Sequence, residues 1–111
     1  MDLLLNVNTH SEREAVIAAQ GRVNAATAVA VKARIRKLVD AGLTRIVCDL
    51  TEVGLLDSAG LSALVAGLKA TRERGGSLKL VGLNPQAAGI FRLTRLDHVF
   101  EIYPSLEAAL A

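Results

Sequence analysis

Strand-like and helix-like patterns alternate along the chain from residue 45 onward, and this alternation limits the folds that the sequence can adopt. Residues 45–50 form a compact run of branched apolar side chains, which is typical of a buried strand. Apolar side chains then recur at helical spacing between residues 61 and 68, and residues 78–81 repeat the strand pattern. Alternating strands and helices need right-handed crossovers, so the pattern predicts parallel strands in an α/β fold.

The remaining segments complete the predicted order of elements. Residues 3–7 and 15–20 read as two strands of a hairpin, which makes the sheet mixed. The other expected elements are a helix that begins near Asn24 or Thr27 and stops at Gly42, a loop over residues 51–56, a helix over residues 85–94, a strand over residues 98–102 and a short helix over residues 105–110. The prediction is a single α/β domain over residues 1–111, with about four helices packed on a mixed sheet.

The composition fits a folded domain and does not favour nucleic-acid binding. The chain has 111 residues, of which 51% are hydrophobic, and this is enough to form a core. The formal net charge is only +2, and aromatic residues make up 3%, so a base-stacking platform or a strong phosphate-binding patch is not expected. The densest basic group, residues 32–37, is interleaved with apolar residues and is typical of a solvated helix face.

Several kinds of site and location are not indicated by the sequence. Cys48 lies within an apolar run and is expected to be a buried, inert thiol. One cysteine and two distant histidines do not form a ligand cluster, so neither a metal nor a cofactor is expected. The start of the chain lacks the features of a signal peptide, and no apolar stretch has the length of a membrane span. We therefore expect a cytoplasmic protein without membrane insertion.

The segment around Ser58 carries the strongest functional signal. Ser58 is predicted in the first turn of a helix, directly after a buried strand and its loop. Free backbone N–H groups and the positive end of the helix dipole favour an anion at this place, so a phosphate group could be accommodated there. The alternative is that Asp57 or Ser58 only caps the helix, and the two interpretations are compatible.

The same segment resembles a known family signature. Asp57-Ser58-Ala59-Gly60-Leu61 is similar to the Asp-Ser-(Ser/Thr)-Gly-Leu motif of the anti-sigma factor antagonists, or anti-anti-sigma factors, of the STAS domain family. Further segments resemble the family in the same order along almost the whole chain: residues 20–24, 45–50, 74–78, 93–100 and 105–110. Two positions depart from the family pattern, because Asn24 stands where Asp is frequent and Ala59 replaces Ser or Thr.

The resemblance implies a non-enzymatic regulator of transcription that works by partner switching. Ser58 would be the phosphoacceptor, and the kinase would be an anti-sigma factor of the histidine-kinase-like ATPase type. The unphosphorylated protein would bind that partner, phosphorylation would release it, and a phosphatase would reset the switch. The expected partner-binding residues are Arg22, Asn24, Leu55, Leu56, Asp57, Ser58, Ala59 and Gly60. A monomer or weak dimer is expected, and the loss of charge at Asn24 bears on partner choice and on phosphorylation.

Two other functions were weighed. A hydrolase built from Ser58 with His10 or His98 lacks the Gly-x-Ser-x-Gly elbow, because Leu56 occupies the first glycine position. STAS domains also occur as scaffold subunits of bacterial lipid-transport ATPases and of stress-signalling assemblies, where no phosphorylation cycle is required. The departure at Asn24 keeps this second alternative open.

Overall fold

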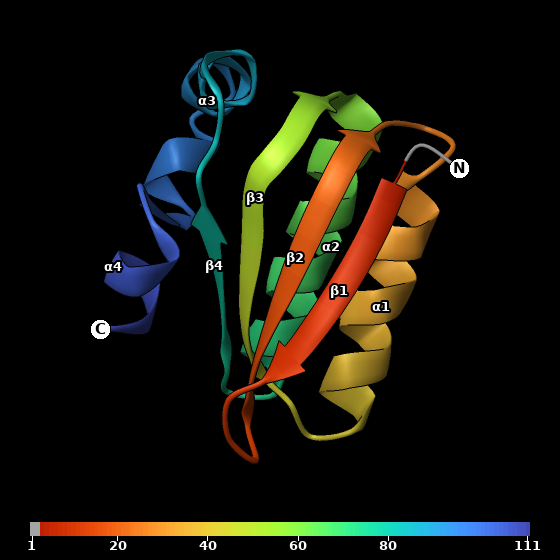
Figure 1. Cartoon of the computed structure of the whole chain (residues 1–111), viewed down its shortest axis with the longest axis vertical. Helices are drawn as coiled ribbons and strands as arrows, with labels where there is room; N and C mark the ends of the chain where they lie inside the picture. The colour runs from red at the N-terminus through yellow and green to blue at the C-terminus, as the bar shows by residue number, and fades with distance from the viewer. Residues whose placement is uncertain (1–2) are drawn as a thin grey trace.

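The computed structural model describes residues 3–111, which form a five-stranded sheet and four α-helices (Figure 1). The sheet order is β1-β2-β3-β4-β5, in which β1 is antiparallel to β2 and all other neighbours are parallel. The strands are β1 Leu3–Thr9, β2 Glu14–Val23, β3 Arg45–Leu56, β4 Ser77–Val81 and β5 Glu101–Tyr103. The helices are α1 Ala28–Asp40, α2 Ser58–Glu73, α3 Pro85–Leu93 and α4 Leu106–Leu110, with a 3-10 turn, η1, at Leu96–His98. The predicted mixed α/β sheet is confirmed.

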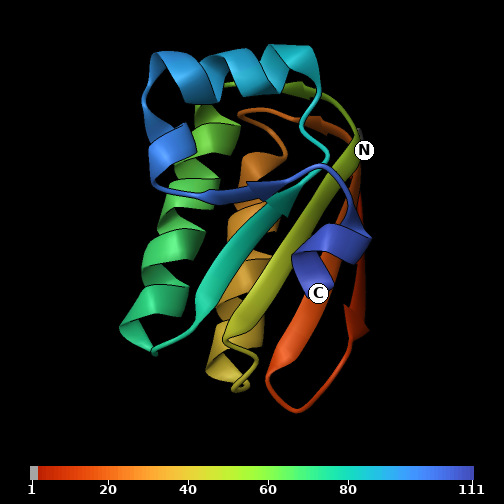
Figure 2. The same cartoon turned by 90° about the vertical axis from the view of Figure 1, so that its left-hand side faces the viewer.

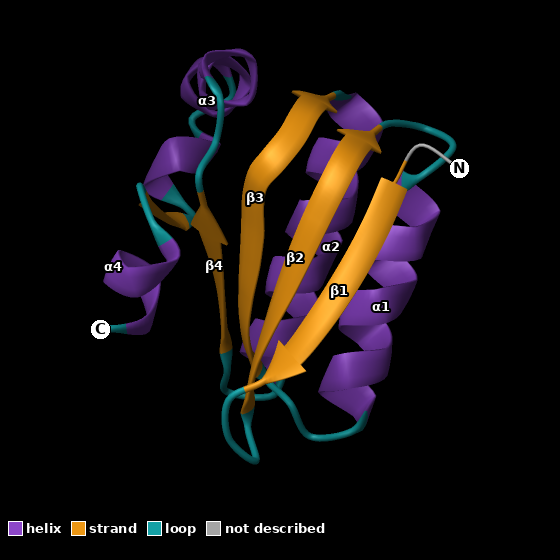
Figure 3. Cartoon of the chain, viewed as in Figure 1, coloured by secondary structure: helices purple, strands orange, loops and turns teal. Residues whose placement is uncertain are grey.

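The helices cover the sheet unequally (Figure 3). Helices α1 and α2 lie side by side on one face, and the main core lies between them and the strands. Helix α4 covers a small part of the other face, where Ala109 packs with Val16, Val47 and Val81. Helix α3 lies across the end of the sheet at which α2 begins (Figure 2). This end of the sheet therefore collects the start of α2, the start of α3 and the ends of the parallel strands.

Close packing fixes α2 against its neighbours. A Cβ atom on Gly67 would lie 2.8 Å from Cδ1 of Ile35, so glycine allows α1 and α2 to approach each other closely. Cys48 is buried in the main core, as predicted, and burial raises the pKa of its thiol to about 12. The thiol is therefore protonated at neutral pH and lacks the thiolate character of a reactive cysteine.

The segment predicted as a loop over residues 51–56 is the second half of a strand. Strand β3 continues to Leu56 and pairs with β2 as far as Val23. The pairing has irregularities between Ala18 and Gln20 and between Gly21 and Arg22, so buried side chains on β3 do not alternate regularly there. A strand whose burial departs from period two resembles a loop in the sequence, which explains the wrong prediction.

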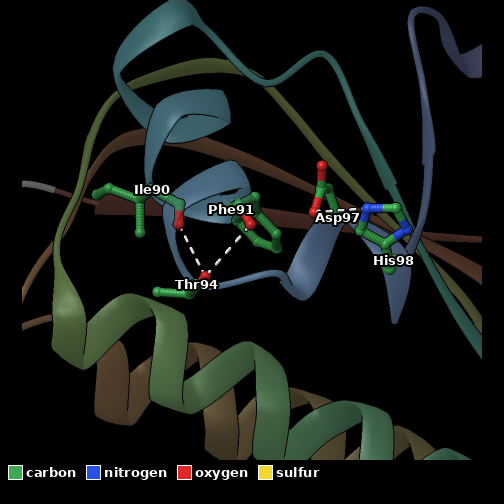
Figure 4. Close-up of polar contacts among 5 residues, drawn as sticks. All are labelled: Ile90, Phe91, Thr94, Asp97 and His98. Carbon is green, nitrogen blue, oxygen red and sulfur yellow. Dashed lines mark hydrogen bonds and ion pairs between the residues drawn. The ribbon is translucent and has the colours of Figure 1, made fainter.

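The last predicted strand begins later than expected, after the turn η1 (Figure 4). Thr94 ends helix α3, and its Oγ1 donates to the carbonyl oxygens of Ile90 (2.7 Å) and Phe91 (3.3 Å). His98 belongs to the turn, with its Nε2 3.9 Å from Oδ1 of Asp97, and β5 starts at Glu101. The strand predicted over residues 98–102 is therefore partly wrong, because a turn occupies its beginning.

Candidate functional site at the start of helix α2

The ends of β2 and β3 bring the predicted site residues together. Arg22 pairs with Leu55 and Val23 with Leu56, so the last residues of both strands lie side by side. The chain then turns into α2, and the N–H of Asp57 donates to the carbonyl oxygen of Val23 at 3.1 Å. The turn at Asp57 is thereby attached to the end of β2 before the helix begins.

Asp57 caps helix α2, and Ser58 is the first residue of the helix. Oδ1 of Asp57 accepts hydrogen bonds from the N–H groups of Ala59 (2.9 Å) and Gly60 (3.1 Å). Ser58 is exposed, and its hydroxyl has no hydrogen-bond partner among residues 3–111. The two adjacent residues therefore have different roles, because the aspartate completes the helix end while the serine hydroxyl points to no internal partner.

The cap at Asp57 reduces the number of free N–H groups that the start of α2 could offer to a phosphate. The N–H groups of Ala59 and Gly60 are already bonded to the Asp57 carboxylate. A phosphoryl group on the exposed Ser58 would therefore add about −1.5 to −2 charges beside an existing negative charge. The surface at the start of α2 would become strongly anionic.

Gly60 lets α2 approach the strand ends closely. A Cβ atom at this position would lie 2.6 Å from Cδ1 of Leu56, 2.8 Å from Cγ1 of Val23 and 2.8 Å from the carbonyl oxygen of Val23. Gly60 is buried and Leu56 is only 1% exposed. Both residues were predicted to bind a partner, and the structure places them beneath the surface, where they support the turn.

The other predicted site residues reach the surface. Leu55 is 38% exposed and Arg22 is exposed, while Asn24, Asp57 and Ala59 are half-buried. Apart from Asn24, these residues lie on the paired strand ends or in the turn that follows them. The predicted site residues that are exposed or half-buried are called the Ser58 surface: Arg22, Asn24, Leu55, Asp57, Ser58 and Ala59.

Asn24 organises the turn that precedes α1. Its Oδ1 accepts from the N–H groups of Ala26 (3.0 Å) and Thr27 (3.2 Å), and Oγ1 of Thr27 donates to the carbonyl oxygen of Arg22 at 2.7 Å. Helix α1 itself begins at Ala28, after Thr27. Asn24 therefore caps the turn and not the helix. An aspartate would offer the same acceptor oxygen. Asn24 in place of the frequent family Asp therefore removes a negative charge and keeps the hydrogen bonds of the turn.

Sequence analysis missed two residues that hold the end of β3. The side-chain amide of Gln86 bonds to both backbone groups of Leu56, and Nδ2 of Asn84 donates to the carbonyl oxygens of Val53 (3.3 Å) and Gly54 (3.1 Å). These contacts span about 30 residues and leave no periodic pattern in the sequence. The only available signal was Asn84-Pro85, which marks the start of a helix.

Two alternatives to the Ser58 site are a metal centre and a pair of Ser58 with a histidine. Within residues 3–111, no group of three or more His, Cys, Asp or Glu side chains could hold a metal ion, and no helix is long and apolar enough to cross a membrane. His10 lies before the start of β2. Ser58 lies two residues after Leu56, which pairs with the last residue of that ten-residue strand. The length of such a strand, about 30 Å, separates His10 from Ser58.

Comparisons with known proteins agree with this fold. The model of the STAS domain matches residues 6–109, so the chain belongs to the STAS domain family. The anti-sigma-B factor antagonist of Listeria monocytogenes is 31% identical over 104 residues, which cover 92% of this chain and 90% of the relative. A crystal structure of an anti-sigma factor antagonist from Mycobacterium paratuberculosis is 30% identical, with a TM-score of 0.83 and coverage of 97% of this chain and 91% of that one.

A more distant structure shares the fold. The unphosphorylated anti-sigma factor antagonist SpoIIAA is 16% identical to this chain, with a TM-score of 0.84 over 96% of this chain and 93% of its own. The relatives described above are named as anti-sigma factor antagonists. These similarities support the antagonist function and do not support the alternative of a transporter scaffold.

Proposed function

We propose that this protein is an anti-sigma factor antagonist whose binding to its partner is controlled by phosphorylation of Ser58. The observation that carries the proposal is the separation of roles at the start of α2, where Asp57 caps the helix and the exposed Ser58 hydroxyl has no bond to lose. A hydroxyl in this position can be modified without disturbing the fold. The relatives named as antagonists support the choice of an anti-sigma factor as the partner.

The modification is a phosphoryl transfer from ATP that the partner catalyses. Oγ of Ser58 attacks the γ-phosphorus of ATP, the bond to the bridging oxygen breaks, ADP leaves, and the hydroxyl proton passes to a base of the kinase. The chain supplies the acceptor and no catalytic group, so it is a substrate and not an enzyme. A phosphatase returns Ser58 to its hydroxyl form by hydrolysis. A cytoplasmic location is part of the proposal, since ATP and sigma factors act in the cytoplasm.

Electrostatics explains why the modification would release the partner. The partner surface must accept Leu55 and the charge of Asp57 in the unmodified protein. A phosphoryl group adds about −1.5 to −2 charges to the centre of the Ser58 surface. An interface formed around a neutral hydroxyl would then contain an unpaired dianion, whose desolvation is unfavourable.

The exposed apolar side chains support a monomer or weak dimer. The most exposed large ones, Leu93 (88%), Val29 (70%) and Leu4 (60%), lie on three different elements. Leu55, with 38% exposure, is the large apolar residue of the Ser58 surface. Apolar area that is spread in this way does not provide the continuous patch that a stable dimer needs.

The proposal is tested by capture from host lysate with wild-type protein, Ser58→Asp and Ser58→Ala, followed by mass spectrometry. We expect wild type and Ser58→Ala to capture a histidine-kinase-like ATPase, and Ser58→Asp to lose it by more than about tenfold, because the carboxylate imitates part of the phosphate charge. Ser62→Asp places the same charge on the next turn of α2 and serves as the control. Incubation of the captured ATPase with ATP should add one phosphate to wild type and none to Ser58→Ala.

Two results would count against the proposal. Equal capture of the same ATPase by wild type and Ser58→Asp would remove the phosphorylation switch. Equal capture of transporter subunits by all variants would instead support the scaffold function, with Ser58 as an ordinary first residue of a helix.

A further inference from the structure

The second half of β3 has a strand neighbour on only one side. Strand β2 pairs with β3 as far as Leu56, whereas β4 pairs only with residues Arg45 to Asp49. Strand β4 ends at Val81, and the chain then turns into α3. The backbone groups on the β4 side of residues 50–56 would therefore face solvent unless other groups bond to them.

Two side-chain amides from the start of α3 occupy the place of the missing strand. Nε2 of Gln86 donates to the carbonyl oxygen of Leu56 at 2.7 Å, and the N–H of Leu56 donates to Oε1 of Gln86 at 3.0 Å. Nδ2 of Asn84 donates to the carbonyl oxygens of Val53 and Gly54, while its Oδ1 accepts from the N–H of Ala87 and caps α3. A primary amide has both a donor and an acceptor, so Gln86 imitates one peptide unit of a neighbouring strand.

The Gln86 contact acts next to the phosphorylation site. Leu56 immediately precedes Asp57 and Ser58. Its buried side chain packs directly against Gly60 of α2. On the opposite side, the carbonyl oxygen of Val23 accepts from the N–H of Asp57. The turn that carries Ser58 is therefore held from two sides, by the backbone of β2 and by the side chain of Gln86.

From this arrangement we infer that Gln86 is a positioning residue for Ser58. By fixing both backbone groups of Leu56, it holds the end of β3 extended and presents Oγ of Ser58 to the kinase in a single geometry. This inference rests on the proposed function, since it concerns the phosphorylation of the same serine. Gln86 itself is exposed and lies in the first turn of α3, so its loss is expected to act locally and not on the core.

The first test measures backbone hydrogen exchange in the isolated protein by NMR. Gln86→Leu removes both hydrogen bonds to Leu56, and we expect the Leu56 amide to exchange roughly tenfold faster than in wild type. Gln20→Leu is the matched control, because Gln20 is the other glutamine of the chain and is exposed on β2, outside the Ser58 surface. Unchanged exchange at Leu56 in Gln86→Leu would overturn the inference.

The second test measures phosphorylation by the ATPase that wild-type protein captures. We expect Gln86→Leu to lower kcat by roughly tenfold with KM changed by less than about twofold, because the acceptor oxygen is misplaced while the surface that binds the kinase is retained. Gln20→Leu should behave as wild type, and the thermal midpoint should remain close to the wild-type value in both variants. A purely structural role would change the thermal midpoint and leave kcat unaltered.

The outcomes separate this inference from the proposed function. If wild type is phosphorylated and Gln86→Leu is phosphorylated equally fast, only the inference is wrong. If the captured ATPase does not phosphorylate wild type, the proposed function fails and the inference fails with it.

Gln86→Glu tests the contact with Leu56 through the pKa of the introduced carboxyl group, which would be ordinary if that side chain were surrounded by water. The ionised carboxylate can accept from the N–H of Leu56 and repels its carbonyl oxygen, whereas the protonated form can both donate and accept. The pKa of the introduced carboxyl group should therefore rise above the ordinary glutamate value of about 4.3. Protection of the Leu56 amide should be regained as the pH falls through this raised pKa. An ordinary pKa would show that the amide contact is not formed in solution.

Discussion

The two ends of the sheet are closed by different means. At the end where the parallel strands finish, a side-chain oxygen accepts backbone N–H groups after each strand. The four residues, in order from β2 to β5, are Asn24, Asp57, Asn84 and Ser105. At the opposite end, α1 and α2 are followed by glycines with left-handed backbones, Gly42 (φ 91°) and Gly75 (φ 73°). The first end, which we call the side-chain-capped end, follows its strands mainly with polar side chains, and the opposite end stops α1 and α2 with left-handed glycines. Two residues depart from this division: Gly82 (φ 73°) follows β4 at the first end, and Oγ of Ser11 accepts from the N–H groups of Arg13 and Glu14 at the opposite end.

This difference explains why the candidate site lies where it does. A glycine in a left-handed turn offers no functional group, so a change there can alter stability but not the chemistry of the surface. A polar cap places charge and hydrogen-bonding groups at the surface, and its neighbours can be modified or recognised. In this protein the Ser58 surface occupies the side-chain-capped end, together with the start of α3.

Gly60→Val should lower the free energy of unfolding more than any other substitution proposed here, because Gly60 is buried where α2 packs against the ends of β2 and β3. The added side chain would collide with Leu56 and with the backbone of Val23, and we expect a loss of about 3 kcal/mol in the free energy of unfolding. Urea denaturation followed by circular dichroism measures this quantity. Gly89→Val is the control on α3, since a Cβ atom there lies no closer than 3.9 Å to a neighbour. Equal losses at both positions would contradict the close approach.

Asp57→Ala and Gly42→Ala compare the two ends directly. Each should lower the free energy of unfolding by about 1 kcal/mol, the first through loss of a helix cap and the second through a left-handed conformation that alanine disfavours. Only Asp57→Ala should also change partner binding, which titration calorimetry with the captured ATPase would measure. If Gly42→Ala weakened binding as much as Asp57→Ala, function would not be confined to the side-chain-capped end.

Asn24→Asp should have the smallest effect on stability and a selective effect on binding. The acceptor oxygen of the turn is retained, so the free energy of unfolding should change by less than about 0.5 kcal/mol. The added negative charge restores the frequent family residue and should change the affinity for the ATPase by up to about tenfold. Measuring that affinity at low and high salt would show the charge effect, since screening reduces it. An affinity that is independent of both the substitution and the salt would place Asn24 outside the interface.

The sequence was sufficient to predict the order of elements and the position of Ser58. The apolar run over residues 45–50 and the helical spacing after residue 61 are local signals, and they are strong because buried faces repeat with the period of the element. Asp57 and Ser58 were both compatible with a cap. The structure assigns the cap to Asp57, because only the hydrogen bonds to Ala59 and Gly60 distinguish the two residues.

The features that the sequence did not reveal depend on contacts between distant segments. The irregular pairing of β2 with β3 hides the second half of β3, because its buried residues lose the alternating pattern. The amide of Gln86 reaches Leu56 across 30 positions, and an exposed glutamine near the start of a helix has no sequence feature that indicates such a contact. The turn at Leu96–His98 similarly shortens a strand that the apolar residues alone would extend.

The assignment of the helix cap to Asp57 also bears on how such a domain can evolve. Because position 58 contributes no hydrogen bond that holds the turn, substitutions there are nearly free of selection for folding, whereas position 57 is constrained by it. A lineage could exchange the serine for a residue that is never modified and still inherit an intact domain. Under the proposed function, in which Ser58 is the phosphoacceptor, the same architecture can gain or lose regulation through one codon, and position 58 is the informative place to examine when paralogues of this chain diverge in behaviour.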